Sequence, residues 1–284
     1  TVGVLAMVPE HLASIFSLGG VAPMIRLLSN ITLLPFQEDE GDDGDVNVYH
    51  EALNSLCSAL EEIISSADIL QVPNLLETTR ACVGVLQKHS KLLSIVQSAL
   101  HLLCAISGSP ELAHRQLCIE NDILEAIGNI LRGNPSNAKI VHSVTKIYSN
   151  FSECDDDVAI AICRRNASKM IITCLEKNLT VLSLDGTTVA IDAAGTVTSP
   201  HAVTQMICGF LPILYRLSTI LPEGREVLRR QGALNCLCDV FEKFHLLQSV
   251  DGKHHMNRED IRDWCLKIIR ILLEESDIVE TLKR

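Results

Sequence analysis

The histidine pair His254 and His255 is the feature of this sequence that comes nearest to a metal site. Asp251 and Glu259 lie close by in the chain, and imidazole and carboxylate groups are common ligands of divalent metals. The pair follows Gly252 in a polar linker, where adjacent histidines are more often solvated than bound. We therefore expect no metal site here, and the chain offers no cofactor motif elsewhere.

Eleven cysteines are an odd number, and they are scattered over apolar helix faces. No Cys-x-x-Cys occurs, and Cys236-x-Cys238 places its two thiols on different sides of a helix, which suits no structural zinc site. Small buried hydrophobes in a reducing compartment are the simpler interpretation. We expect a cytoplasmic protein.

Motifs for catalysis are missing from the sequence. There is no Gly-x-Ser-x-Gly, no His-Glu-x-x-His and no glycine loop that could cradle a phosphate. The carboxylates fall on exposed faces or in loops rather than beside apolar runs that would raise their pKa. We expect a protein that is not an enzyme.

The net charge of −11 argues against nucleic acid or an anionic membrane as the main ligand, because both require clustered Lys and Arg. A protein partner, and more naturally a basic one, fits this charge. No unbroken apolar run reaches the roughly 18–20 residues that span a membrane. The acidic run from Glu38 to Asp45 lacks the residue order of an EF-hand, so we expect a solvated loop. Asp155 to Asp157 should open a helix whose far end carries Arg164 and Arg165.

The elements that would position any site are helices, because a short apolar triad with i, i+3, i+4 spacing returns five times along the chain. The intervals from Leu86 to Leu131 and from Leu131 to Leu175 are 45 and 44 residues, which is typical of helical repeats of about 40–47 residues. Two longer intervals each enclose a stretch of different composition. The triads are Met24-Leu27-Leu28, Cys82-Val85-Leu86, Ile127-Ile130-Leu131, Ile171-Cys174-Leu175 and Leu237-Val240-Phe241.

A second apolar pattern runs out of phase with the first, so each repeat contains at least two amphipathic helices. Such a pair cannot bury its own apolar face, and stacked neighbours would form a continuous core with a concave surface. The fourth copy is hard to place: Gly209 to Ile213 is its best candidate, although Pro212 would kink that helix unless it lies in the first turn. The clear copies begin at Ala52, Ala99, Val144 and Trp264.

These motifs resemble the armadillo repeat, which has a Gly-Ala-hydrophobic opening and a later Leu-Ser-Asn-Leu segment. The openings correspond to Gly20-Val21-Ala22 and Gly232-Ala233-Leu234, and the later segment corresponds to Tyr148-Ser149-Asn150-Phe151. The resemblance covers nearly the whole chain and implies an all-α, right-handed α-solenoid of about five repeats, one domain over residues 1–284. A HEAT-like array is the near alternative. Because Leu5 to Gly20 reads like the tail of a repeat, we expect a longer protein.

Two insertions interrupt the repeats, near residues 36–46 and 179–201. In the second, Thr180 to Leu184 and Thr187 to Ile191 alternate apolar and polar residues around Asp185-Gly186. Asp-Gly is favoured in two-residue type I′ turns, so the sequence predicts an inserted β-hairpin.

The armadillo resemblance implies that the third helix of each repeat lines a concave groove. Nuclear-import adaptors of similar repeat pattern carry Trp and then Asn there, whereas this chain has Lys146 and Asn150, which makes classical import-signal binding doubtful. The expected function is a monomeric, non-enzymatic scaffold or adaptor that binds a peptide or helix of a protein partner. Alternatives are the armadillo module of a co-chaperone or assembly factor, or a structural component of a large complex. The groove residues implied by the resemblance are Asn54, Ser58, His101, Lys146, Asn150 and Arg270.

Overall fold

The computed structural model describes the larger part of the chain, and that part contains twelve α-helices and one pair of two-residue strands. It is all-α in class, as the sequence predicts. Contacts divide the chain into two compact units, Thr1–Ala126 and Ile127–Arg284. That both belong to one repeat domain stays a prediction. The residues described are 19–33, 43–66, 75–108, 123–165, 167–181, 190–191, 197–198, 200–220, 222–246 and 255–274.

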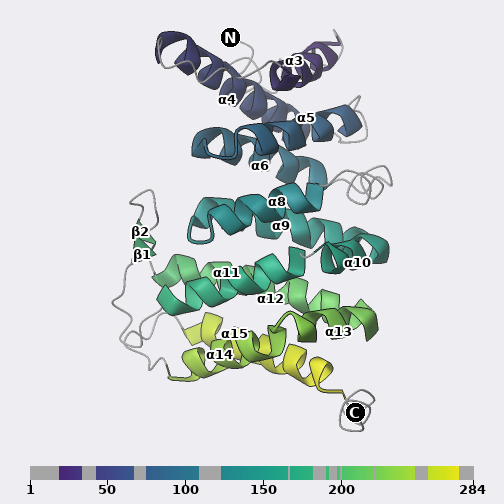
Figure 1. Cartoon of the computed structure of the whole chain (residues 1–284), viewed down its shortest axis with the longest axis vertical. Helices are drawn as coiled ribbons and strands as arrows, with labels where there is room; N and C mark the ends of the chain where they lie inside the picture. Colours follow the sequence, from purple (N-terminus) through teal and green to yellow (C-terminus); the bar gives the residue numbers. More distant parts are fainter. Residues whose placement is uncertain are drawn as a thin grey trace. The chain divides into compact units, whose positions relative to one another are not determined.

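The first unit contains two layers of helices, because α3 packs on α5 and α4 packs on α6, while α5 and α6 also contact each other (Figure 1). Its core consists of aliphatic side chains such as Ile25, Leu53 and Leu100, which are fully buried. Each such burial contributes about 1.5–3 kcal/mol. The helices are α3 (Val21–Leu33), α4 (Asp43–Ser66), α5 (Leu75–Lys88) and α6 (Leu93–Ser107).

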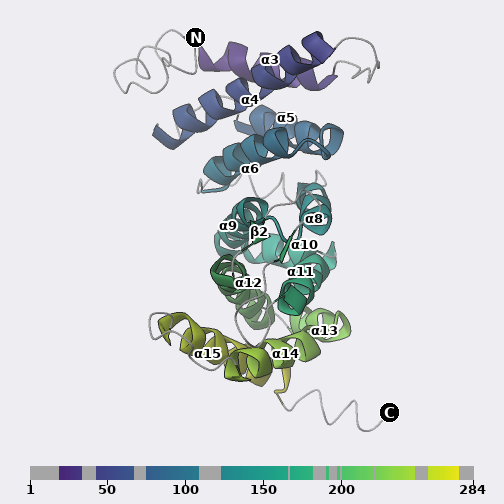
Figure 2. The ribbon, with the colours of Figure 1, turned by 90° about the vertical axis from the view of Figure 1, so that its left-hand side faces the viewer.

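The second unit has the same alternation. Helix α12 lies between α9 and α15, while α11 contacts α14, and Figure 2 shows α9 and α12 on the opposite flank from α8 and α11. The short helices α10 and α13 connect the layers. Helix α8 begins in the first unit and ends in the second. The helices are α8 (Ile123–Gly133), α9 (Ala138–Cys154), α10 (Asp156–Arg164), α11 (Ala167–Val181), α12 (Pro200–Ile220), α13 (Pro222–Arg230), α14 (Ala233–Leu246) and α15 (His255–Leu272).

Helix starts follow the local sequence in several places. Gly232 has φ +88° immediately before α14, a conformation that L-residues with a Cβ rarely adopt. In the first unit the positive φ, +67°, belongs to Gly19, one residue before the glycine that opens the armadillo-like motif. The prediction for α10 is confirmed: its cap is Asp155, whose carboxylate accepts a hydrogen bond from the Asp157 N–H at 2.7 Å.

The predicted β-hairpin around Asp185-Gly186 is not supported. Thr180 and Val181 form the last residues of α11, and Ala190–Ile191 (β1) pairs antiparallel with Val197–Thr198 (β2) instead. The helix continues because Leu179 is buried and the Asn178 amide bonds to the carbonyl of Pro135 at 2.8 Å, contacts that outweigh local strand preference. Residues 182–189 lie outside the described chain.

The acidic insertion is shorter than predicted, because Asp43 to Val46 belong to α4; residues 36–42 lie outside the described chain. Pro212 is inside the 21-residue helix α12 and not in its first turn. Among the described residues, one stretch of α12, Ala202–Ile220, is long and apolar enough to cross a membrane, and half of it is buried. Buried helices of globular proteins share these properties.

Close packing at Gly224 generates a stability prediction. A Cβ at this position would lie 2.5 Å from the carbonyl oxygen of Leu217, and a backbone atom cannot easily move away. We expect Gly224→Ala to destabilise the second unit by about 1–3 kcal/mol in urea unfolding. Gly133→Ala is the control, because no described atom other than those of its chain neighbours and its own helix backbone lies within 4 Å of its Cβ, and it should be neutral or stabilising by up to about 1 kcal/mol. Equal effects of the two substitutions would contradict this packing.

Burial of His89 generates a pH prediction. His89 is 2% exposed, and burial, with Lys88 and His50 nearby, lowers its pKa from the ordinary value of 6.5; the Tyr49 hydroxyl lies 3.3 Å from its Nε2. Below pH 6.5 the imidazole of His89 binds a proton more readily in the unfolded chain than in the folded chain. The free energy of unfolding of the first unit should therefore fall as the pH falls. His89→Gln should remove this part of the pH dependence between about pH 6.5 and 5, measured by urea unfolding. An unchanged slope would show that other groups titrate.

Candidate functional site

In the first unit the predicted groove residues lie on the contacting helices α4 and α6. The Asn54 side chain donates from Nδ2 to the Ser94 hydroxyl at 3.4 Å. Its Oδ1 is buried and has no hydrogen-bond partner among the described residues. Ser58 is exposed. The three predicted residues of this unit therefore come from one helix pair.

His101 of α6 is exposed, and its Nδ1 lies 3.9 Å from the Glu61 carboxylate of α4, with which it forms an ion pair when the imidazole is protonated. Partial burial raises the pKa of the Glu61 carboxyl, His101 opposes that shift, and Glu62 adds to it. The pair is 46% and 35% exposed at its two side chains. Exposed pairs of this kind contribute little to stability, so this polarity is not needed for folding.

In the second unit Lys146 and Asn150 lie one turn apart on α9. Lys146 is exposed and Asn150 is half-buried, whereas Tyr148 between them is fully buried. Beside them, the Ser149 hydroxyl donates to the Glu153 carboxylate at 3.0 Å. The outer side of α9 is thus polar and carries both charges.

A small pocket of about 100 Å³ lies next to this polar side of α9, between α9 and α12. Its opening is polar, with His142 and Gln205, and Thr145 packs there against Gly209. A Cβ on Gly209 would lie 2.7 Å from the Thr145 methyl group. The glycine therefore allows the two helices to approach closely at this point.

Arg216 of α12 has a structural role. Its guanidinium donates to the Asp156 carboxylate at 2.6 Å and, more weakly, to the Ser152 carbonyl at 3.3 Å. These bonds tie α12 to the junction of α9 and α10. Arg216 is consequently occupied and is not free to bind a partner.

An aromatic and cationic cluster joins α12 to α15. The rings of Tyr215 and Trp264 meet edge to face with centroids 5.2 Å apart, and the Lys267 ammonium lies 5.2 Å from the Trp264 ring centre. Both rings are half-buried. A partly exposed Trp next to a cation is the kind of group that is enriched among energetically dominant interface residues.

Arg270, the predicted groove residue of α15, is exposed. It is one turn from Lys267 in sequence, and no described contact joins it to the Tyr215–Trp264 cluster. Leu266 of the same helix and Leu273, immediately after its last residue, are 48% and 43% exposed. This part of α15 is therefore an apolar and cationic surface.

In the sequence, Trp264 is marked only by its repeat position, and no local pattern predicts the cluster. Tyr215 lies three residues after Pro212 in the helix whose repeat position was hard to place. One available signal was the rarity of tryptophan, since Trp264 is the single Trp of the chain. The partner ring, 49 residues earlier in sequence, could be found only from the structure.

The buried cysteines are protonated at neutral pH. Burial raises the pKa of Cys163 to about 11 and that of Cys174 to about 12. The pKa values of Cys57 and Cys265 are also raised by burial, to about 12. All described cysteines with assigned burial are free thiols. Within the described ranges, no three His, Cys, Asp or Glu side chains converge on a point that could hold a metal ion.

Comparisons with known proteins give a likeness in fold. No family model and no curated protein matches the chain. A solved structure described as an engineered protein of the Northeast Structural Genomics Consortium superposes with a TM-score of 0.59 at 13% sequence identity, covering 96% of this chain and 87% of that chain. At this identity the likeness concerns the backbone arrangement alone.

The Tyr215–Trp264 contact generates a spectroscopic prediction. Tyr215→Ala should expose the indole, shift its emission to longer wavelength and increase its quenching by acrylamide, while destabilising the second unit by about 0.5–1.5 kcal/mol beyond lost burial. Tyr215→Phe, which keeps the ring, is the matched control and should leave the spectrum unchanged. Because Trp264 is the only indole, the signal is unambiguous, and identical spectra for Tyr215→Ala and the parent would contradict the contact.

Proposed function

We propose that this chain is a non-enzymatic, cytoplasmic scaffold built from armadillo-like repeats, which binds a peptide or helix of a protein partner. The repeat spacing, the armadillo-like motifs and the alternation of helix layers within each unit support this proposal. In the second unit the binding groove would run across the outer sides of α9, α12 and α15. We expect the protein to act as a monomer.

The observation that carries the proposal is the composition of that face. Lys146 on α9 and Lys267 on α15 are exposed, whereas Asn150 and Trp264 beside them are half-buried. The exposed charges of Lys146 and Lys267 are not required for packing. The face offers amide, ammonium and aromatic groups, a combination that recognises the backbone and side chains of a peptide.

The buried, protonated cysteines favour a binding function over a thiol-based activity. A catalytic thiol needs a lowered pKa, and burial at Cys57, Cys174 and Cys265 raises it. The free state of the described thiols also suits the reducing compartment that we propose.

A structural role in a larger assembly is the second candidate, favoured by the exposed Leu266 and Leu273. Exposed large apolar side chains that lie close together are a common feature of permanent contacts. In that case α15, and not the groove, would make the contact, and Leu266→Ser with Leu273→Ser would disrupt assembly.

The groove is tested with the double substitution Lys146→Ala, Asn150→Ala. We expect no loss of stability beyond about 0.5 kcal/mol but a loss of at least about tenfold in affinity for a groove partner. Quantitative capture from cell extract compares three baits: the parent, this variant, and Lys243→Ala, Asn235→Ala. The third carries the same residue types on α14.

A partner lost by the groove variant and kept by the α14 control supports the proposal. That partner is then purified and added in increasing amounts to the parent chain while the fluorescence emission of Trp264 is recorded. If the groove variant captures everything that the parent captures, the groove is not the binding surface.

A further inference from the structure

A pocket of about 390 Å³ lies on the other side of the second unit, between the end of α8 and α11. This volume falls within the range of sites that accept small molecules or side chains, about 300–1,000 Å³. The groove face described above contributes no residue to it. The described residues that line it are Leu131, Arg132, Pro135, Lys169, Met170, Thr173, Cys174 and Lys177.

The charged side chains among the described residues that line this pocket are all positive. They are Arg132, Lys169 and Lys177, and no carboxylate of the described chain lines the pocket. None of these three cations forms an ion pair with another described residue. The whole chain has a net charge of −11, so three positive side chains around one pocket differ in sign from the chain as a whole.

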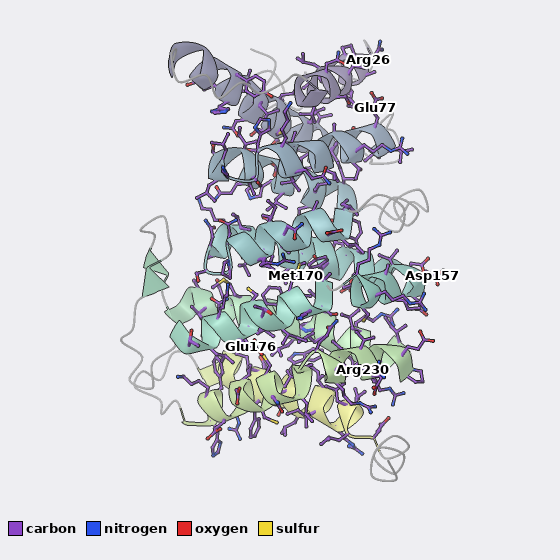
Figure 3. The ribbon with its side chains drawn as sticks, viewed as in Figure 1. Arg26, Glu77, Asp157, Met170, Glu176 and Arg230 are labelled. Atoms are coloured by element: carbon purple, nitrogen blue, oxygen red, sulfur yellow. The ribbon has the colours of Figure 1, made fainter. Side chains whose placement is uncertain are left out.

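The acidic residue of α11 does not neutralise the pocket. Burial and, after it, the negative charge of Glu176 raise the pKa of the Cys236 thiol in α14. Figure 3 shows Glu176 on the α14 side of α11, whereas Met170 lies on the α8 side. The two sides of α11 therefore differ in charge. The positive potential between α8 and α11 remains unopposed by this helix.

The walls of the pocket are held in place by buried hydrogen bonds. The Asn178 amide, only 2% exposed, donates to the carbonyl oxygens of Pro135 and Cys174, each at 2.8 Å. The Cys174 thiol also contacts the Pro135 carbonyl at 3.4 Å. The loop after α8 is thus fixed to α11, and a preformed site loses less entropy when it binds a ligand.

Two rows of α11 side chains define what can fit. Lys169, Thr173 and Lys177 follow at intervals of four residues and form the rim, while Met170 and Cys174 are buried at the floor. At a rise of 1.5 Å per residue, the two lysines start about 12 Å apart along the helix. The apolar floor lies between them.

We propose that this pocket binds an extended acidic segment of a protein partner, with the pattern acid-x-apolar-x-acid. An extended chain advances about 3.3 Å per residue and places residues i, i+2 and i+4 on the same side. Its two acidic residues are then about 13 Å apart, which matches the two lysines. The central apolar side chain enters the pocket above Met170, and Arg132 adds a third cation from α8.

A single inorganic anion does not match this arrangement. It could contact one lysine and Arg132 but would leave the apolar floor empty and the far lysine without a partner. Charge and shape together specify a ligand that is apolar in its middle and anionic at both ends.

The test uses the 284-residue chain and a labelled peptide, fluorescein-Gly-Glu-Ser-Leu-Ser-Glu-Gly, in fluorescence anisotropy. We expect saturable binding that weakens as salt rises. Replacing the central Leu of the peptide by Gly, or both Glu by Gln, should each lower the affinity at least about tenfold.

On the protein side, Lys169→Glu with Lys177→Glu should abolish binding. The control, Arg80→Glu with Lys91→Glu, makes the same change in net charge at exposed positions of the first unit and should leave affinity within about twofold. The groove variant Lys146→Ala, Asn150→Ala should also bind the peptide normally, so this result is independent of the proposed groove.

Three outcomes would overturn the proposal: equal binding of the Gln peptide, equal loss in both charge-reversal variants, or complete competition by inorganic phosphate at the concentration of the peptide. The last would identify a simple anion site. Thermal unfolding followed at Trp264 confirms that each variant is folded, and the peptide variants test the parent protein without any substitution.

Discussion

Burial of α12 between α9 and α15 is the contact on which the second unit depends. Ile207, Phe210 and Leu214 are 0–1% exposed, and each contributes about 1.5–3 kcal/mol when it is removed from water. Gly209 lets α9 approach at Thr145, and Gly224 lets α13 approach the end of α12 at Leu217. Because an amphipathic helix pair cannot bury its apolar face alone, these contacts decide which sides of the helices stay outside.

The helices could be predicted from sequence because their apolar spacing is locally visible. The triad Ile127, Ile130 and Leu131 is buried as expected. The same pattern does not guarantee burial: Leu27, the middle member of the first triad, is 52% exposed. Local spacing identifies a helix face, but what covers that face depends on neighbours that are distant in sequence.

The hairpin prediction was wrong for a related reason. Asp185-Gly186 and the alternation before it favour strands, but Asn178 and Leu179 are held by Pro135 and the core, and α11 continues to Val181. In α12 the opposite occurs, since Pro212 weakens the helical signal while burial on both flanks maintains the helix. Tertiary contacts outweighed local preference in both segments.

Of the candidate site, the sequence could predict that Lys146 and Asn150 face outward, because Tyr148 between them fixes the orientation of α9. It could not pair Tyr215 with Trp264 or Arg132 with Lys169, because each pair comes from helices that meet only in the fold. Clusters formed by such pairs leave no local motif, which is why the pocket beside α11 has no counterpart in the sequence patterns.

Pro212 has one more consequence for the face that α12 shares with its neighbours. Proline has no N–H, so the carbonyl of Cys208, four residues earlier, lacks the donor that would close that rung of the helix. That oxygen therefore does not take part in the regular i to i−4 hydrogen bonding of α12. Since every amino acid has this carbonyl, the missing helical hydrogen bond is set by Pro212 and would remain if the side chain at position 208 changed.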